Sequence, residues 1–154
     1  MNGRRWSVET LLSSHRALGL DSNVLIYLLE DAGTLGDLAG VIIDAVEDRR
    51  VDGVLASVGV AEILAGPARA RDAARFERTA DELGSMPMRI VPLTAEIAAD
   101  AAWLRGAGEL GLADAVHLAS ARAAGATAFV TNDRRIRPLS GLEVVYLADL
   151  VARP

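Results

Sequence analysis

Short, almost wholly apolar runs alternate along this chain with longer segments whose apolar residues recur at helical spacing. Runs of this length are typical of strands buried on both faces, and such strands occur in parallel sheets covered by helices on both sides. The pattern predicts an α/β fold, namely a three-layer α/β/α domain with a parallel sheet of four or five strands. The predicted strands are residues 17–21, 53–57, 89–93 and 126–132, with residues 142–147 as the fifth.

Helical spacing predicts helices between these strands. They cover residues 22–31, 34–50, 58–66, 68–84, 94–108 and 112–125. The Gly66-Pro67 pair predicts the end of the third helix, because proline lacks the amide hydrogen that a helix interior uses. We assign residues 17–150 to a single domain and residues 1–16 to an N-terminal extension, whose apolar spacing allows a short helix.

Composition narrows the classes of function. The chain has 154 residues, no cysteine and a formal net charge of −5. Disulfides, zinc fingers and thiolate catalysis are therefore excluded, and the negative charge argues against a protein that coats nucleic acid through bulk charge. No uninterrupted apolar stretch reaches the roughly 18 residues that a membrane span needs, and the first residues do not form an export signal. We expect a cytoplasmic protein with no membrane partner.

Four acidic residues interrupt the most apolar parts of the chain. Asp21, Glu62 and Asp114 are each the only charged residue of a long run, and Asp133 directly follows another uncharged run. A buried carboxylate is costly unless it is paired. Sites in open parallel sheets form beyond the carboxyl ends of the strands, and the acids lie after predicted strand ends or early in the helices that follow. We expect Asp21, Glu62 and Asp133 to meet at that edge, and Asp114 joins them if its helix starts there.

Carboxylates that meet in this way need a cation. Two of them about 4 Å apart repel each other by roughly 4 kcal/mol at an effective dielectric near 20. Ligand sets made of oxygen select Mg²⁺, with Mn²⁺ as a substitute, over zinc. The sequence therefore predicts a catalytic Mg²⁺ site formed by Asp21, Glu62, Asp114 and Asp133. Such a site suits the hydrolysis of phosphodiesters by metal-activated water.

The segments LDSNVLIYLL, VAEILAG, LADAVHLASA and FVTNDRRI occur in the order and approximate spacing of the PIN-domain family. Over residues 18–147 the chain most resembles the VapC-type toxin ribonucleases of VapBC toxin–antitoxin modules. The resemblance implies a PIN-like fold and a Mg²⁺-dependent endoribonuclease that hydrolyses RNA as the toxin of a type II toxin–antitoxin system. It also implies a homodimer and a VapB-type antitoxin whose tail enters the acidic groove.

The resemblance also assigns roles to individual residues. The four acids would surround one or two Mg²⁺ ions, with Asp21 and Asp114 as the firmest ligands. Ser22, Thr131 and Asn132 would orient these ligands or position water. One departure from the family is the N-terminal extension, because relatives usually begin within a few residues of their first strand.

Each acid also has a simpler interpretation. Asp21 could only cap a helix, Glu62 could point to solvent, and Asp114 could only stabilise the dipole of its helix. Asp133 could pair locally with the arginines that follow it. These interpretations explain single acids, but they do not explain why all four interrupt apolar runs. His117 is predicted to be a packed histidine or one that orients a ligand, with a general-base role as the alternative.

Three arginines follow the predicted site. Arg134, Arg135 and Arg137 are candidates for contacts with RNA phosphates. A second arginine set shares one helical face and is either solvated or contacts RNA or an antitoxin; it comprises Arg71, Arg75 and Arg78. Trp103 is predicted to lie in the core or in a dimer interface.

Two rival functions belong to other classes. One is a catalytically inactive PIN-fold module that only binds RNA or a partner, against which the complete set of acids argues. The other is a phosphotransferase or phosphatase with an aspartyl nucleophile. That chemistry normally needs a second aspartate two residues after the first, where this chain has Asn23.

Overall fold

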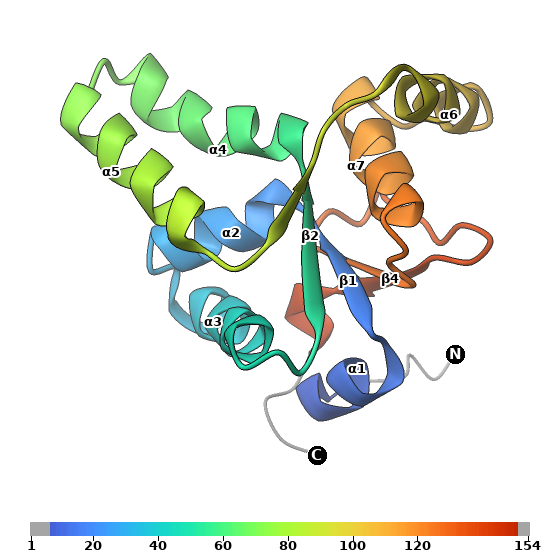
Figure 1. The fold of residues 1–154 in the computed structure, drawn as a ribbon, viewed down its shortest axis with the longest axis horizontal. Coiled ribbons are helices and arrows are strands. Elements are labelled where there is room, and N and C mark those ends of the chain that lie inside the picture. The colour runs from blue at the N-terminus through green and yellow to red at the C-terminus, as the bar shows by residue number, and fades with distance from the viewer. Residues whose placement is uncertain (1–6, 151–154) are drawn as a thin grey trace.

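The computed structural model describes residues 7–150, and a five-stranded sheet lies at its centre (Figure 1). The strands are β1 (Ala17–Leu20), β2 (Asp52–Ala56), β3 (Arg89–Val91), β4 (Ala128–Thr131) and β5 (Glu143–Tyr146), in the spatial order β3-β2-β1-β4-β5. All neighbouring strands are parallel. The predicted parallel sheet is confirmed with five strands, and β1 runs through its middle.

Helices cover both faces of this sheet. They are α1 (Val8–Ser14), α2 (Ser22–Leu29), α3 (Gly33–Glu47), α4 (Ser57–Arg69), α5 (Ala73–Ser85), α6 (Ala95–Gly106) and α7 (Leu112–Ala123), with a short 3-10 helix at Leu147–Asp149. The core on one face contains residues of α1, α2 and α3, and the core on the other face contains residues of α6 and α7. Helices α4 and α5 pack against each other and extend as an arm beyond the sheet (Figure 1). The predicted three-layer α/β/α architecture is confirmed.

The middle strand shows why the layers fit closely. Leu18 and Leu20 point into the core under α1, α2 and α3, while the alternate residues face α7. A Cβ atom on Gly19 would lie 2.5 Å from the Cβ of Ala121 and 2.9 Å from the ring of Phe129. Only glycine therefore allows this close approach of α7 to β1, and the approach fixes α7 beside the strand that ends at Asp21.

One predicted helix end is wrong. Helix α4 continues through Gly66-Pro67 and ends at Arg69. A proline removes one helical hydrogen bond, but here it stands near the helix end with its ring buried, and the amide of Ala70 still donates to the carbonyl of Gly66 at 3.1 Å. The next helix begins later than predicted, at Ala73, where the side chain of Asp72 accepts a hydrogen bond from the amide of Arg75.

The chain before β1 also takes part in the core. The apolar residues Val8, Leu11 and Leu12 of α1 are buried in the same cluster as residues of α3 and β1. Residues 1–6 of the predicted extension lie outside the described residues, and its boundary at residue 16 stays a prediction. Between residues 7 and 150, no helix is long and apolar enough to cross a membrane.

Candidate metal centre

The four acids come from four segments that converge beyond the carboxyl ends of the strands. Asp21 follows β1 directly, and Asp133 follows β4 after one further residue. Glu62 lies within α4, which continues from β2, and Asp114 lies in the first turn of α7. The crossing of parallel strands and helices thus produces the convergence that the sequence predicts.

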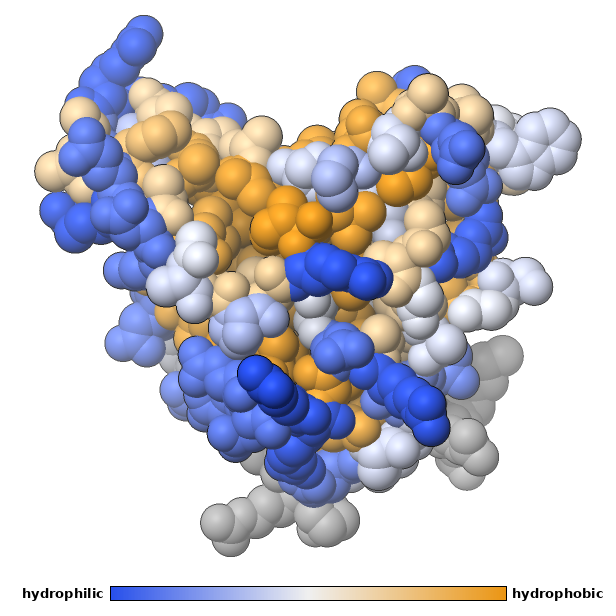
Figure 2. Space-filling model, viewed as in Figure 1, coloured by the Kyte–Doolittle hydropathy of each residue, from blue (hydrophilic) through white to orange (hydrophobic). Residues whose placement is uncertain are grey.

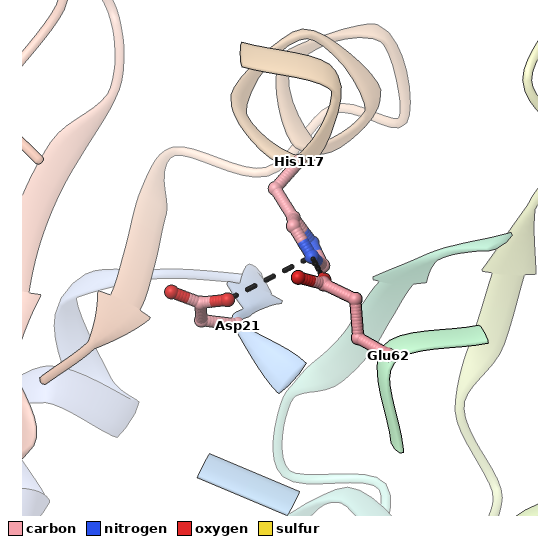
Figure 3. Close-up of side chains that lie close together, drawn as sticks. All are labelled: Asp21, Glu62 and His117. Atoms are coloured by element: carbon pink, nitrogen blue, oxygen red, sulfur yellow. Dashed lines mark hydrogen bonds and ion pairs between the residues drawn. The ribbon is translucent and has the colours of Figure 1, made fainter. Parts of the chain in front are cut away.

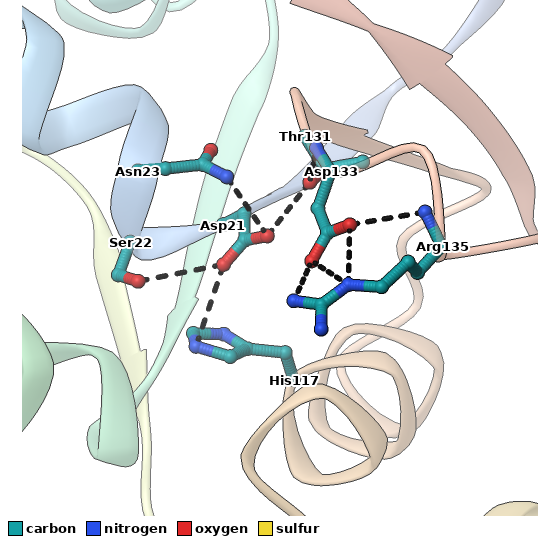
Figure 4. Close-up of polar contacts among 7 residues, drawn as sticks. All are labelled: Asp21, Ser22, Asn23, His117, Thr131, Asp133 and Arg135. Carbon is teal, nitrogen blue, oxygen red and sulfur yellow. Dashed lines mark hydrogen bonds and ion pairs between the residues drawn. The ribbon is translucent and has the colours of Figure 1, made fainter. Parts of the chain in front are cut away.

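Asp21 is the most buried of the four, with 4% of its surface exposed. It occupies the N-cap position of α2, yet its side chain makes no capping hydrogen bond. Instead, the hydroxyl of Thr131 donates to Asp21 Oδ2 at 2.7 Å (Figure 4). Burial raises the pKa of Asp21, although His117 and the Thr131 hydroxyl partly offset this effect. The carboxylate is therefore held inside the site and is not used to cap the helix.

His117 joins two of the acids. Its Nε2 lies 2.5 Å from Glu62 Oε1 and 3.7 Å from Asp21 Oδ1 (Figure 3). The hydrogen bond from His117 lowers the pKa of Glu62, although partial burial acts in the opposite direction. An ionised carboxylate only accepts hydrogen bonds, so Nε2 carries the hydrogen. The imidazole thus turns the half-buried Glu62 side chain toward Asp21.

Asp114 is a partly buried carboxylate without a hydrogen bond or ion pair to any residue between 7 and 150. Its pKa is raised by burial first, and then by the negative charges of Asp21 and Asp133. Repulsion from two other acids shows that Asp114 shares their site. His117 offsets this effect only in part, and a bound cation would relieve the remaining repulsion.

Asp133 pairs with Arg135, one of the arginines that follow it, as its simpler interpretation predicts. The backbone amide and Nε of Arg135 both donate to Asp133 Oδ1 at 3.0 Å, and Arg135 Nη2 donates to Oδ2 at 2.7 Å (Figure 4). These hydrogen bonds lower the pKa of Asp133. Asp133 nevertheless remains connected to the other acids, because its amide donates to the same Thr131 hydroxyl that holds Asp21.

The residues predicted to support the ligands have different surroundings. Ser22 is buried, and its hydroxyl lies 3.4 Å from Asp21 Oδ1. Asn132 turns away: its Oδ1 accepts from the amide of Ala148 at 3.1 Å, and its amide nitrogen lies 3.5 Å from the Tyr27 hydroxyl. Asn132 therefore anchors the chain around the site, while Ser22 contacts an acid directly.

The donor chemistry fits a divalent cation. Among residues 7–150, the side chains of Asp21, Glu62 and His117 offer ligand atoms that all lie within 4.8 Å of one another. Asp114 adds an unpaired carboxylate beside them. The carboxylate oxygens are the ligand type that Mg²⁺ and Mn²⁺ prefer, while His117 donates its Nε2 hydrogen to Glu62 and so orients that carboxylate.

For two residues the sequence predicted the kind of contact but not the partner. His117 contacts two acids, and the available signal was its position one helical turn after Asp114 on a buried face. Arg135 binds Asp133 through two side-chain nitrogens, and the signal was its spacing of two residues from that acid. Both contacts depend on side-chain conformations that residue spacing alone does not determine.

The Thr131 hydroxyl connects the two ends of the site, which gives a first prediction. Replacing Thr131 with Val keeps the buried shape but removes the donor to Asp21 and the acceptor for the amide of Asp133. We expect a 10- to 100-fold loss of Mn²⁺ affinity, roughly the effect of removing a group that orients a metal ligand. Titration calorimetry measures this affinity, and Thr131→Ser should restore most of it. Equal affinity for the Val variant and the native protein would show that the hydroxyl does not organise the site.

Comparisons with known proteins agree with this fold. The family model of the PIN domain matches residues 19–142. A chain of VapBC2 from Rickettsia felis, bound to a DNA fragment from its promoter, superposes with a TM-score of 0.69 at 18% identity, covering 84% of this chain and 98% of that chain. For DNA-bound VapBC from Salmonella typhimurium the TM-score is 0.68 at 15% identity, with 86% of this chain and 98% of that chain covered.

A toxin–antitoxin complex from Klebsiella pneumoniae gives a TM-score of 0.60 at 22% identity, covering 82% of this chain and 94% of that chain. No curated protein matches the chain. At these identities the solved structures share the fold with this chain, while the family model also spans all four converging acids. The chain belongs to the PIN-domain family.

Proposed function

We propose that the protein is a Mg²⁺-dependent endoribonuclease and the VapC-type toxin of a type II toxin–antitoxin system. One observation carries the proposal: four acids from separate segments converge at the carboxyl edge of the sheet, and two of them, Asp21 and Asp114, have raised pKa values. A site that only stabilised the fold would not concentrate like charges in this way. A site that holds a cation for phosphodiester chemistry requires such a concentration.

Each residue then has a role. Asp21, Asp114, Glu62 and Asp133 are the proposed ligands of Mg²⁺, or of Mn²⁺ as its substitute. When bound, the ion supplies Lewis acidity toward a phosphoryl oxygen and lowers the pKa of a bound water. Thr131 and Ser22 hold Asp21 in place, and His117 orients Glu62.

The proposed partners are an RNA substrate and a VapB-type antitoxin. The support is the PIN-domain match together with structural neighbours that are VapBC or other toxin–antitoxin complexes. RNA is proposed as the substrate on the resemblance to VapC-type ribonucleases. An antitoxin would inhibit by placing a segment in the acidic groove, and toxin and antitoxin would act in the cytoplasm.

We also propose that the protein forms a homodimer. Large apolar side chains are exposed on the connected segments from β3 to α7, namely Ile90, Leu93, Trp103 and Leu112. Trp103 is 80% exposed, so the prediction that it might lie in the core is wrong. Apolar side chains also gather in the notch between the α4–α5 arm and the α6–α7 pair (Figure 2). Exposed apolar surface of this kind is typical of protein interfaces.

Cleavage of RNA by the purified, antitoxin-free protein tests the proposal. We expect cleavage of total cellular RNA with Mg²⁺ or Mn²⁺, and none with excess EDTA. Asp114→Asn should abolish cleavage, because it removes a proposed metal-binding carboxylate that makes no hydrogen bond or ion pair with residues 7–150. Asp37→Asn is the matched control, since Asp37 is an exposed acid on α3 outside the site.

Two results would contradict the proposal. Cleavage that persists in EDTA or in Asp114→Asn would show that the converging acids are not the catalytic centre. Absence of cleavage by a protein shown to be folded and loaded with Mn²⁺ would favour the inactive RNA- or partner-binding module.

A further inference from the structure

A groove of about 590 Å³ lies beside the candidate metal centre. One wall is the end of α6 and the connection to α7, which supplies Leu104 and Leu110. The other wall is the connection between β4 and β5, which supplies Leu139 and the arginines Arg135 and Arg137. We call this space, with its apolar walls and basic rim, the arginine groove.

Both walls lead directly to acids of the metal centre. The α6–α7 connection continues into the first turn of α7, where Asp114 lies. The β4–β5 connection begins at Asn132 and Asp133. Arg135 belongs to both places, because its guanidinium binds Asp133 and also lines the groove (Figure 4). The arginine groove therefore adjoins the metal centre at Arg135.

The three arginines of the groove differ in their availability. Arg134 is fully engaged: two of its nitrogens donate to Asp149 at 2.7 and 2.6 Å, and its guanidinium stacks 4.3 Å from the centre of the Tyr146 ring. Arg137 is exposed and makes no hydrogen bond or ion pair with the described part of the chain. Arg135 is 83% exposed and bound only to its near neighbour Asp133.

The chemistry of the groove selects an anionic ligand with an apolar body. The protein has a net charge of −5, yet the lining of the arginine groove carries three arginines and one acid, Glu109. A guanidinium binds phosphate oxygens through two parallel hydrogen bonds. The leucines offer a surface for a ribose and a base, which are weakly polar on their faces.

We propose that the arginine groove is the subsite for the nucleotide next to the scissile phosphate, with Arg137 and Arg135 binding its phosphate. The proposal rests on the proposed nuclease function and extends it, because it places the direction in which the RNA strand leaves the metal centre. It assigns phosphate binding to Arg137 and Arg135, and it leaves Arg134 as an anchor for the wall of the groove.

Arg135 then has two alternative partners. Nε carries a single hydrogen, which Asp133 accepts, so the edge formed by Nε and Nη2 cannot hold Asp133 and a phosphate at the same time. Once Asp133 is a ligand of the metal, Arg135 is released toward the groove. The metal and Arg135 therefore compete for Asp133. Binding of the metal frees Arg135, so it favours binding of the RNA strand.

Binding of a fluorescein-labelled oligouridylate in EDTA tests the subsite without cleavage. Arg137→Gln should weaken binding about three- to tenfold, the effect expected of one partly exposed charged contact. It should also reduce the slope of log affinity against log salt by about 0.7, the value for one phosphate contact of a single strand. The control Arg49→Gln removes the same charge near the opposite edge of the sheet, between α3 and β2, and should lower affinity less than twofold.

Manganese binding followed by electron paramagnetic resonance tests the competition at Asp133. Arg135→Gln should raise Mn²⁺ affinity about two- to fivefold, because removing an exposed ion pair frees the carboxylate. The same variant should weaken oligouridylate binding when Mn²⁺ is present. Arg134→Gln should leave Mn²⁺ affinity unchanged, since Arg134 pairs with Asp149.

The outcomes separate this proposal from the nuclease proposal. RNA cleavage together with unchanged oligouridylate affinity in Arg137→Gln would overturn the subsite and leave the nuclease intact. Weaker oligouridylate binding without any cleavage would support the subsite on a binding module. Unchanged oligouridylate affinity with weaker binding of an oligoglutamate peptide would overturn the subsite in favour of an acidic protein partner.

Discussion

Replacing Asp21 with Asn is expected to abolish metal-dependent cleavage and, without metal, to make the protein more stable to heat. The loss of rate should be about a thousandfold or more, because a metal ligand contributes several kcal/mol to the transition state and each 1.36 kcal/mol is tenfold. The gain in stability has a different cause. Burial raises the pKa of Asp21, so its charged form is less favourable in the folded protein than in the unfolded chain.

The sign of the stability effect follows from this shift. A carboxyl group with a raised pKa binds its proton more tightly in the folded state, so it lowers stability as pH rises above the pKa of the unfolded chain. Asn carries no charge and can still accept the hydrogen bond from Thr131. We expect the melting temperature in EDTA at neutral pH to rise by roughly 2–4 °C, the change that about 1 kcal/mol produces in a domain of this size.

Thermal unfolding in EDTA at several pH values provides the measurement. The difference in melting temperature between Asp21→Asn and the native protein should shrink as pH falls below the ordinary pKa of aspartate. There the native carboxyl is protonated in both the folded and the unfolded state. Added Mn²⁺ should stabilise the native protein but not the variant. A variant that melts below the native protein in EDTA at neutral pH would show that Asp21 stabilises the fold and is not held for a cation.

Replacing His117 with Leu is expected to weaken both metal binding and cleavage. Leucine fills much of the buried space beside Phe129 but cannot donate to Glu62. We expect cleavage and Mn²⁺ affinity to fall 10- to 100-fold, as when a metal ligand loses the partner that orients it. His117→Gln is the matched variant, because its side-chain amide can still donate, and it should retain more of both properties.

The pH dependence of Mn²⁺ affinity shows how His117 acts. In the native protein the hydrogen bond from His117 lowers the pKa of Glu62, so Glu62 stays ionised as pH falls. Without that donor the pKa of Glu62 rises, and Mn²⁺ affinity should begin to fall at a higher pH in His117→Leu. Calorimetric titration across pH 4–7 measures the shift. If Mn²⁺ affinity falls over the same acidic pH range in the variant and in the native protein, His117 only packs in the core.

The positions of the strands along the chain were predictable because strands buried on both faces need apolar residues at nearly every position. Residues 17–20 and 128–131 are apolar at every position or nearly so, as expected of strands covered on both faces. The end of α4 was not predictable from Pro67, because the tolerance for proline depends on how near the helix end lies and on what packs against the ring.

The sequence predicted which strand ends and helices carry the acids of the candidate site. The position of Asp21 and Asp133 after strand ends required them to share one edge of the sheet. The sequence allowed Asp133 to pair with a following arginine and His117 to orient a ligand, but it did not identify Arg135 and Glu62 as the partners, because side-chain rotamers decide this. The sequence left Trp103 either in the core or in a dimer interface, because the periodicity of α6 does not distinguish the two, and its exposure excludes the core.

Crystals of the protein soaked in Mn²⁺, with anomalous diffraction data, test the central claim most directly. We predict an anomalous peak at the carboxyl edge of the sheet, with oxygen atoms of Asp21 and Asp114 at about 2.2 Å, near the distances found for hard divalent cations. The peak should be absent from crystals of Asp114→Asn. No peak at this edge, or a peak bound only by acids elsewhere on the surface, would contradict a metal centre built from these converging residues.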